Sequence, residues 1–219
     1  MAGVASIGLA FDEACESTER LATVGSNMGD FIKVILASGS PRRRQLLAGA
    51  GIEFDVIESM VPEEHIAGEP ARDYALRMAR DKAIAVSSRF PETIVIGADT
   101  IVVCETQILE KPADAAYARR MLSMLSARTH MVVTAFALAR DGKIIESSPV
   151  ESNVTFRKLS DAEIEAYIAT DEPFDKAGAY GIQGVGGGFI SHVEGSRDNV
   201  MGLPTERVIA ALARHGVKQ

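Results

Sequence analysis

From about residue 33 onward, short apolar runs alternate with stretches whose apolar residues recur at helical spacing. Residues 34–37 form a continuous apolar run, which is typical of a strand buried on both faces. A Ser-Gly-Ser turn follows, and Pro41 favours a helix start because its missing N–H would be unpaired there anyway. This helix is predicted to stop at Gly49 or Gly51, before a strand around 54–57.

The same alternation continues through the middle of the chain. Apolar residues at helical spacing predict a helix over 71–88, and the apolar run 93–97 predicts a second buried strand. That strand is expected to deliver Asp99 and Thr100 at its C-terminal end. A third helix is predicted over about 114–126, with the aspartate at its start as the N-cap.

The last third of the chain predicts a long hairpin followed by a helix. Two β-rich segments, 129–139 and 143–157, flank an Asp-Gly pair, which is a strong signal for a two-residue hairpin turn. Ser160 and Glu163 form a capping box that opens a helix to about residue 169. The segment 178–188 contains too many glycines for the interior of a regular element.

A strand over 189–193 and a helix after Pro204 complete the predicted elements. Because βα units are combined with a long hairpin, the expected fold class is α/β with a mixed sheet. Residues 1–30 show no strand pattern and are expected to form an N-terminal extension outside the core. Residues 31–219 are then expected to form a single domain.

Composition narrows the range of functions. Hydrophobic residues make up 47% and charged residues 24% of the 219 residues, an ordinary balance for a soluble globular protein. The net charge of −7 argues against a nucleic-acid partner, which would require a broad basic surface. No apolar stretch approaches the roughly 20 residues that a membrane span needs, so no membrane partner is expected.

Cysteine usage indicates the compartment. Cys15 and Cys104 form no CxxC pair, and Cys104 ends an apolar β-branched run, where a buried free thiol is expected. The apolar segment 4–11 lacks a basic region before it and is followed at once by two acidic residues, unlike a signal peptide. A reducing, cytoplasmic location is therefore expected.

The strand, turn and helix over 34–47 form a candidate phosphate site. A helix N-terminus offers unpaired backbone N–H groups at the positive end of the helix dipole. Serine hydroxyls in the turn and the guanidinium groups of Arg42 and Arg43 add donors that suit phosphate oxygens. A capped helix with solvated arginines would give the same pattern, and Arg44 is expected to point away from the site. The P-loop sequence is absent.

Further residues along the chain could complete such a site. Asp99 could take a proton from water or hold Mg²⁺ against phosphate oxygens, or it could merely cap a turn. Lys82 and Lys111 could contact phosphate, although each could equally be solvated. Gln183, inside the glycine-rich segment, offers an amide donor and an amide acceptor that suit a base edge, unless that segment is only a flexible loop.

Other catalytic classes lose support. The four histidines are scattered without the spacing of a metal site, and each is expected to be a structural or a surface residue. They are His65, His130, His192 and His215. Neither a GxSxG elbow nor a GxGxxG after a strand occurs, which disfavours triad hydrolases and Rossmann dehydrogenases.

The most specific signal comes from five blocks of sequence. They are LASGSPRRRQLL at 36–47, GADTIVV at 97–103, ILEKPADAAYARRMLSMLSARTH at 108–130, DKAGAYGIQGVGGGFI at 175–190 and GSRDNVMGLP at 195–204. Each block resembles a signature of the Maf family of nucleotide pyrophosphatases, and they occur in the family order over about residues 33–215. A chance match of all five is negligible.

The resemblance implies a Maf-type, ITPase-like fold, with an elongated mixed sheet flanked by helices and two lobes around a deep cleft. It also implies an enzyme that cleaves a nucleoside triphosphate between its α- and β-phosphates, giving the monophosphate and pyrophosphate. The implied cofactor is a divalent metal cation, Mg²⁺ or Mn²⁺. The implied role is nucleotide-pool cleaning. Members of the family often form homodimers, so the resemblance also implies a homodimer.

The resemblance also assigns roles to particular residues. Asp99 falls on the position of the proton acceptor. The phosphate-contacting positions fall on Ser40, Arg42, Arg43, Lys82 and Lys111. Glu63 falls on the acidic metal-side position, with Asp99 as the second candidate metal ligand.

Three residues resemble the branch of the family that prefers dTTP and UTP, namely Arg42, Thr100 and Gln183. CTP and modified pyrimidine triphosphates remain open as further substrates. The chain departs from the family pattern at three loop positions, with Ala127 and Asp171 in place of glycine and Arg197 in place of an aromatic residue.

Two rival functions remain open on the sequence. One is a non-catalytic nucleotide-binding regulator of cell division. A carboxylate at a strand end with a full set of cations favours turnover over it, because binding alone needs no water-activating base. The other is a purine triphosphate pyrophosphatase of the inosine type, against which Thr100 and Gln183 argue.

Overall fold

The computed structural model describes residues 32–218, so the predicted N-terminal extension lies outside the described residues. The strands are β1 (Val34–Leu36), β2 (Asp55–Val56), β3 (Ile94–Cys104), β4 (Gln107–Leu109), β5 (Thr129–Arg140), β6 (Lys143–Phe156) and β7 (Ile190–Glu194). The α-helices are α1 (Pro41–Gly49), α2 (Ala71–Ser87), α3 (Ala115–Leu125), α4 (Asp161–Ile168), α5 (Arg197–Met201) and α6 (Thr205–Arg214). The 3₁₀ helices are η1 (Glu172–Asp175), η2 (Ala177–Ala179) and η3 (Val185–Phe189).

The strands form one mixed sheet, which confirms the predicted α/β class. Its order is β2-β1-β3-β5-β6-β7, and β4 pairs with β3 off this path. The β1–β2 and β1–β3 pairs are parallel, and the remaining pairs are antiparallel. No helix among residues 32–218 is long and apolar enough to cross a membrane.

Most local predictions are confirmed by the structure. α1 begins at Pro41, and Asp114 caps α3 by accepting a hydrogen bond of 2.8 Å from the Tyr117 backbone N–H. Both halves of the capping box between Ser160 and Glu163 are formed. The β5–β6 hairpin turns at 141–142, where both residues have the positive φ that this tight turn requires.

The prediction that β3 ends before Asp99 is wrong. β3 continues to Cys104, so Asp99 and Thr100 lie at its centre. The physical reason is that β5 pairs with β3 from Val95 to Val103 and supplies hydrogen bonds well beyond the point where β1 stops. The short elements β4 and α5 carry no periodic signal in the sequence and are revealed only by the structure.

One edge of β3 is interrupted, and this interruption creates room for a site. β1 pairs with β3 only over 94–96, and β4 pairs with it only over 102–104. Between them, residues 97–101 have no strand neighbour on that edge within the described part of the chain. Asp99 and Thr100 lie in this open interval.

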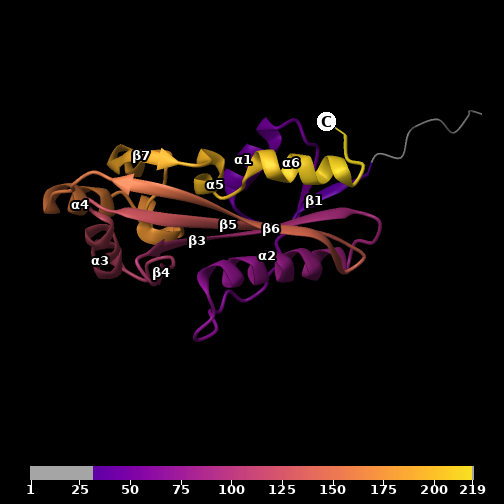
Figure 1. Ribbon diagram of the computed structural model, residues 1–219, viewed down its shortest axis with the longest axis horizontal. Helices are drawn as coiled ribbons and strands as arrows, with labels where there is room; N and C mark the ends of the chain where they lie inside the picture. Colours follow the sequence, from indigo (N-terminus) through magenta and orange to yellow (C-terminus); the bar gives the residue numbers. More distant parts are fainter. Residues whose placement is uncertain (1–31, 219) are drawn as a thin grey trace, which may run out of the picture. The chain divides into compact units, whose positions relative to one another are not determined.

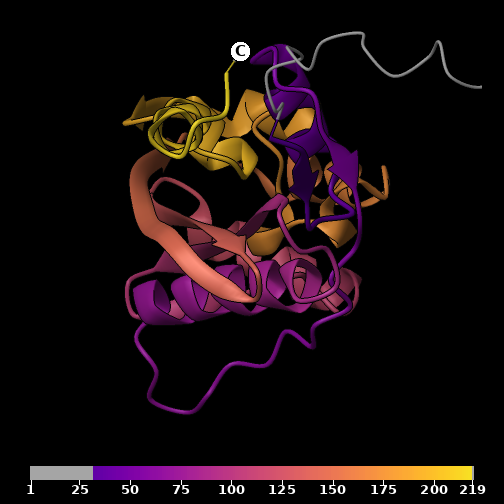
Figure 2. The same cartoon turned by 90° about the vertical axis from the view of Figure 1, so that its right-hand side faces the viewer.

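Helices cover both faces of the sheet (Figures 1 and 2). On one face, α2 lies along β3 and β5 and buries an apolar cluster around Met78, Ile101 and Ala135. The residues on the opposite face of the strands pack under α1 and α6 at one end of the sheet and under α3 and α4 at the other end. The two ends are the two lobes that the family resemblance leads one to expect.

The two lobes keep separate apolar clusters on that opposite face. Along β3, Ala98 belongs to the cluster under α1 and α6, and Val102 belongs to the cluster under α3 and α4. Thr100 stands between them, because alternate residues of a strand point to the same face. Thr134 of β5 pairs directly with Thr100 and occupies the same boundary.

Two of the departures from the family pattern lie where the backbone favours glycine. Ala127 and Asp171 have φ values of 55° and 60°, in the left-handed region. A side chain there costs roughly 1–2 kcal/mol, although aspartate tolerates the region better than alanine does.

Replacing Ala127 by glycine should therefore stabilise the protein. We expect Ala127→Gly to raise the free energy of unfolding by about 0.5–1 kcal/mol, because relief of strain outweighs the larger unfolded-state entropy of glycine. Asp171→Gly, the matched control, should gain less. Urea unfolding of the three proteins measures both effects, and a destabilised Ala127→Gly variant would contradict the argument from strain.

Candidate active site

A cavity of about 460 Å³ opens at the interrupted edge of β3. Its lining comes from the β1–α1 turn, α1, the segment after β2, α2, the centre of β3 and the segment 175–182. It includes eight of the predicted site residues: Ser40, Arg42, Arg43, Glu63, Lys82, Asp99, Thr100 and Lys111. Gln183 is exposed and lies outside the lining, to which the glycine-rich segment contributes Tyr180, Gly181 and Ile182 instead.

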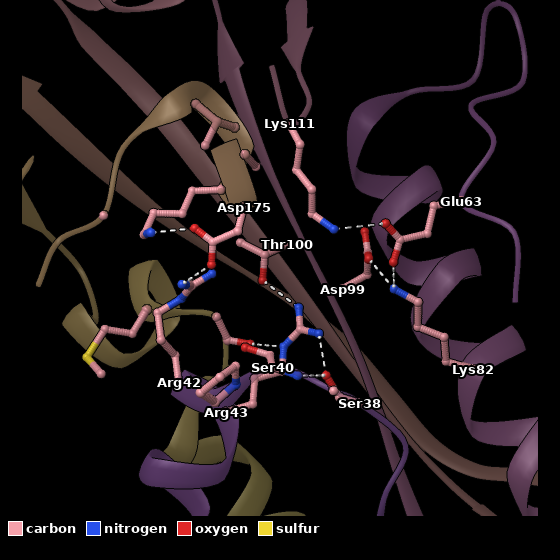
Figure 3. A pocket seen from close by; sticks show the side chains of 18 of the residues that line it. Ser38, Ser40, Arg42, Arg43, Glu63, Lys82, Asp99, Thr100, Lys111 and Asp175 are labelled. Atoms are coloured by element: carbon pink, nitrogen blue, oxygen red, sulfur yellow. Dashed lines mark hydrogen bonds and ion pairs between the residues drawn. The ribbon is translucent and has the colours of Figure 1, made fainter. Parts of the chain in front are cut away.

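Asp99 and Thr100 point to opposite faces of β3, and the open edge lets both line one cavity. Figure 3 shows two groups of side chains, one around Lys82 and Asp99 and the other around Arg43 and Thr100. The first group lies on the α2 face, and the second lies on the face covered by α1. A ligand in the cavity can therefore contact both groups by crossing the strand edge.

On the α2 face, Lys82 joins two carboxylates. A Cβ at Gly97 would lie 2.1 Å from the carbonyl oxygen of Ala79, so glycine is what permits α2 to pack this closely on β3. Lys82 Nζ lies 2.7 Å from Asp99 Oδ1 and also donates to Glu63 Oε1. The Lys82 and Asp99 side chains are only 7% and 11% exposed, so water screens this pair weakly.

Glu63, from the segment between β2 and α2, completes this group. Its carboxylate also lies 3.7 Å from Lys111 Nζ. Partial burial acts to raise the pKa of Glu63, but the charge and hydrogen bond of Lys82, together with the charge of Lys111, outweigh burial and lower it. The cluster therefore holds an ionised Glu63 at neutral pH.

On the other face, Arg43 forms hydrogen bonds to three segments: the β1–α1 turn, the centre of β3 and the end of α5. Its Nε donates to the Gly202 carbonyl oxygen at 2.7 Å, Nη1 to Ser38 Oγ at 3.0 Å, and Nη2 to Thr100 Oγ1 at 3.1 Å. Burial of the guanidinium lowers the pKa of Arg43, and the nearby carboxylates oppose this. Three of its five N–H donors are used within the protein, so two remain for a ligand.

Arg42 reaches across the cavity to the segment that precedes η2. Its Nη1 lies 3.0 Å from Asp175 Oδ2, and Asp175 also pairs with Lys176. Partial burial acts to raise the pKa of Asp175, but Lys176 and Arg42 outweigh this effect and lower it. Arg44 is exposed and outside the cavity lining, as predicted.

The N-terminus of α1 adds uncharged donors to this face. Ser40 is the N-cap residue, but its side chain makes no capping hydrogen bond. Its hydroxyl lines the cavity and is available to a ligand, together with the first backbone N–H groups of the helix. An anionic group is favoured at such a helix end by the helix dipole.

The donor set of the cavity fits a metal ion that arrives with a phosphate ligand. Within residues 32–218, no group of three or more His, Cys, Asp or Glu residues is arranged to hold a metal ion. Glu63 and Asp99 offer two carboxylates that share Lys82. Mg²⁺ typically binds through one or two carboxylates and completes its coordination with water and substrate phosphates.

Some residues of the site carried little or no signal in the sequence. Asp175 and Lys176 lie in the glycine-rich block that resembles the family, yet an isolated Asp-Lys pair indicates no particular role. Thr134 lies within a predicted strand, and only its position opposite Thr100 connects it to the site. Such pairings depend on strand register, which residue type does not reveal.

Five cations therefore line one cavity, together with four carboxylates, in a chain whose net charge is −7. These cationic donors, gathered at a helix N-terminus and beside a buried carboxylate, define an α/β protein with a site suited to a polyphosphate. The family model described as "Maf-like protein" matches residues 33–215. The chain belongs to the Maf family.

Several relatives that are named for an activity are similar to this chain over most of their length. The dTTP/UTP pyrophosphatase of Geobacter metallireducens is 49% identical over 187 residues, which cover 84% of this chain and 96% of that protein. That of Koribacter versatilis is 51% identical over 84% of this chain and 95% of its own length. That of Escherichia coli K12 is 50% identical over 77% and 86%, respectively.

Among solved structures, a HAM1 protein from Coxiella burnetii matches 84% of this chain and 100% of its own chain, with a TM-score of 0.44 and 13% identity. This likeness adds nothing to the family assignment.

Removing the cation shared by Glu63 and Asp99 should destabilise the protein. We expect Lys82→Met to lower the free energy of unfolding at pH 7 by about 3 kcal/mol, because the buried partner carboxylate loses its counter-ion. Lys111→Met is the matched control: its side chain is 60% exposed, and it should cost less than about 1 kcal/mol.

The difference from wild type should shrink as the pH falls. The lowered pKa of Glu63 contributes stability that is present above its unfolded value, near 4.5, and is lost as the pH falls through the folded value. Urea unfolding at pH 7 and at pH 4, in the presence of a chelator, measures both effects. Equal losses for the two variants at pH 7 would contradict the assignment of Lys82 as the shared counter-ion.

Proposed function

We propose that this protein is a nucleoside triphosphate pyrophosphatase that hydrolyses dTTP and UTP to the monophosphate and pyrophosphate. The observation that carries the proposal is the buried Asp99 carboxylate, 2.7 Å from Lys82, in a cavity lined by five cations. The activity for which relatives about 50% identical to this chain are named supports the substrate class. CTP and modified pyrimidine triphosphates remain within the proposal.

In this mechanism the triphosphate lies against the N-terminus of α1. Arg42, with the two free N–H donors of Arg43, binds phosphate oxygens, and the Ser40 hydroxyl donates to them. Lys82 and Lys111 neutralise charge from the opposite face of β3. Most of the catalytic demand is then positioning and charge neutralisation, which a pre-arranged set of donors meets without reorganisation.

Asp99 acts as the general base. It accepts a proton from a water molecule whose oxygen attacks the α-phosphorus, and the bond from that phosphorus to the bridging oxygen breaks. Pyrophosphate leaves with the bonding electron pair. Lys82 holds the carboxylate in position through the 2.7 Å contact at Oδ1, which leaves Oδ2 for the water.

A divalent cation, Mg²⁺ or Mn²⁺, would be held by Glu63 and Asp99 together with phosphate oxygens of the substrate. When bound, it neutralises charge on the polyphosphate. We also propose that residues 31–219 form a single catalytic domain, that the protein acts in the cytoplasm on the nucleotide pool, and that it forms a homodimer. Residues 1–30 have no part in the proposed chemistry.

Loss of the general base should abolish most of the turnover. We expect Asp99→Asn to lower kcat by about 10²- to 10⁴-fold, the usual contribution of a positioned base, while the protein stays folded. Asp73→Asn, on an exposed position of α2, is the control and should retain wild-type activity. Separate assays of pyrophosphate and orthophosphate, over a panel of purine and pyrimidine triphosphates, measure the effect.

Three outcomes of that panel would overturn the proposal in different ways. Near wild-type turnover by Asp99→Asn would remove Asp99 from the mechanism. Tight nucleotide binding without pyrophosphate release by the wild type would favour the regulatory rival. A preference for inosine triphosphate would favour the purine rival.

Substitutions of the two arginines Arg42 and Arg44 of α1 should have very different effects on kcat/KM. Arg42→Ala should lower kcat/KM by about 10- to 150-fold, which corresponds to the loss of charge-assisted hydrogen bonds worth roughly 1.5–3 kcal/mol. Arg44→Ala should leave kcat/KM unchanged, because Arg44 lies outside the cavity lining. Equal effects of the two substitutions would show that Arg42 acts only through the overall charge of the helix.

A further inference from the structure

The hydroxyl group of Thr100 lies in a chain of hydrogen bonds whose direction is determined at both ends. At one end, Arg43 Nη2 lies 3.1 Å from Thr100 Oγ1, and a guanidinium can only donate. At the other end, Thr134 Oγ1 lies 2.7 Å from the carbonyl oxygen of Asn199, which can only accept. Between them, the hydroxyl oxygens of Thr100 and Thr134 are 3.0 Å apart.

These two ends leave one arrangement of protons. Thr134 has a single hydroxyl proton and gives it to the Asn199 carbonyl, so the bond between the two threonines requires the proton of Thr100. Thr100 then receives a hydrogen bond from Arg43 and gives one to Thr134. One lone pair on its oxygen remains, and no proton remains.

The surroundings hold this arrangement in place. Thr134 and Asn199 are both fully buried, at 0% exposure. The Asn199 side-chain amide donates to the Val132 carbonyl oxygen at 3.2 Å and to Ser152 Oγ at 3.0 Å, which locks the residue that supplies the acceptor. Thr134 lies directly opposite Thr100 in the β3–β5 register, at the boundary between the two apolar clusters.

Only Thr100 of this pair lines the cavity. A ligand therefore meets a hydrogen-bond acceptor at this point. A phosphate oxygen is itself an acceptor and gains nothing from Thr100, whereas an N–H or O–H group of the substrate does. The geometry thus favours the nucleoside, rather than the polyphosphate, as the neighbour of Thr100.

We propose that Thr134 is a positioning residue that makes Thr100 an obligate acceptor, and that this acceptor receives the N3–H of a uracil or thymine base. The inference rests on the proposed function. Both bases carry a proton on N3, whereas cytosine has a lone pair there, which would face the lone pair of Thr100. Thr134, without contacting the substrate, would then set the preference of UTP over CTP.

The test compares Thr134→Val with Thr134→Ser in the full-length protein. Valine keeps the shape of the side chain and frees the Thr100 proton, so that Thr100 is able to donate to cytosine N3. We expect Thr134→Val to lower the ratio of kcat/KM for UTP to that for CTP by roughly tenfold, the typical effect of one hydrogen bond. Its kcat for UTP should stay within about threefold of wild type, because the change affects base binding and not the reacting atoms. Thr134→Ser, which keeps the hydroxyl group, should retain the wild-type ratio of kcat/KM for UTP to that for CTP.

A substrate series on the wild-type enzyme tests the same idea without any substitution. 3-Methyl-UTP, whose N3 carries no proton, should be hydrolysed poorly compared with UTP. 2′,3′-Dideoxythymidine triphosphate, which lacks the sugar hydroxyls but keeps N3–H, should be hydrolysed about as well as dTTP. The opposite result would assign the donor to the sugar and overturn the proposal.

The experiments distinguish a failure of the proposed function from a failure of the role proposed for Thr134. No pyrophosphate from UTP or dTTP with the wild type would refute the proposed function itself. Normal turnover of UTP with an unchanged UTP-to-CTP ratio in a folded Thr134→Val variant would refute only the role of Thr134. If Thr134→Val does not fold, equal rates with UTP and 3-methyl-UTP would still refute the assignment of Thr100 as the acceptor for N3–H.

Discussion

The site depends on a difference in length between β3 and the strands that pair with one of its edges. β1 leaves β3 after residue 96 and β4 joins it only at residue 102, so the edge between them is open. Adjacent residues of a strand point to opposite faces, and a closed sheet would keep Asp99 and Thr100 apart. At the open edge both side chains line the same cavity. The continuous pairing of β3 with β5 keeps this part of the strand rigid.

Around this opening, cationic side chains are gathered, although the chain as a whole is acidic. The protein carries a net charge of −7, yet five cations line the cavity. Each cation has partners within the protein: two carboxylates for Lys82, three oxygen acceptors for Arg43, the shared Asp175 for Arg42 and Lys176, and a longer contact to Glu63 for Lys111. These partners arrange the cations before any ligand arrives, which reduces the cost of organising a polyanion site.

Local chemistry made much of the fold predictable. Proline at the first position of α1, the aspartate cap of α3, the capping box of α4 and the Asp-Gly hairpin each act within a few residues, and all were predictable at the right place. The end of β3 was not predictable, because it depends on pairing with β5, a distant segment of the chain in which Met131 lies opposite Val103. Eight of the nine candidate site residues meet in the cavity, whereas Gln183 is exposed outside it. A glycine-rich segment has too little local preference to reveal which of its residues face inward.

The sequence by itself determined the class of fold, the starts of the helices and the family, because these depend on periodicity, capping and blocks of contiguous residues. Only the tertiary structure decided that Asp99 and Thr100 share a cavity from opposite faces, that Arg43 is already engaged by three acceptors, and that Thr134 stands behind Thr100. The physical reason is that these relations are set by strand register and by where neighbouring strands stop. Both arise from hydrogen bonds between segments far apart in the chain, and no local pattern encodes them.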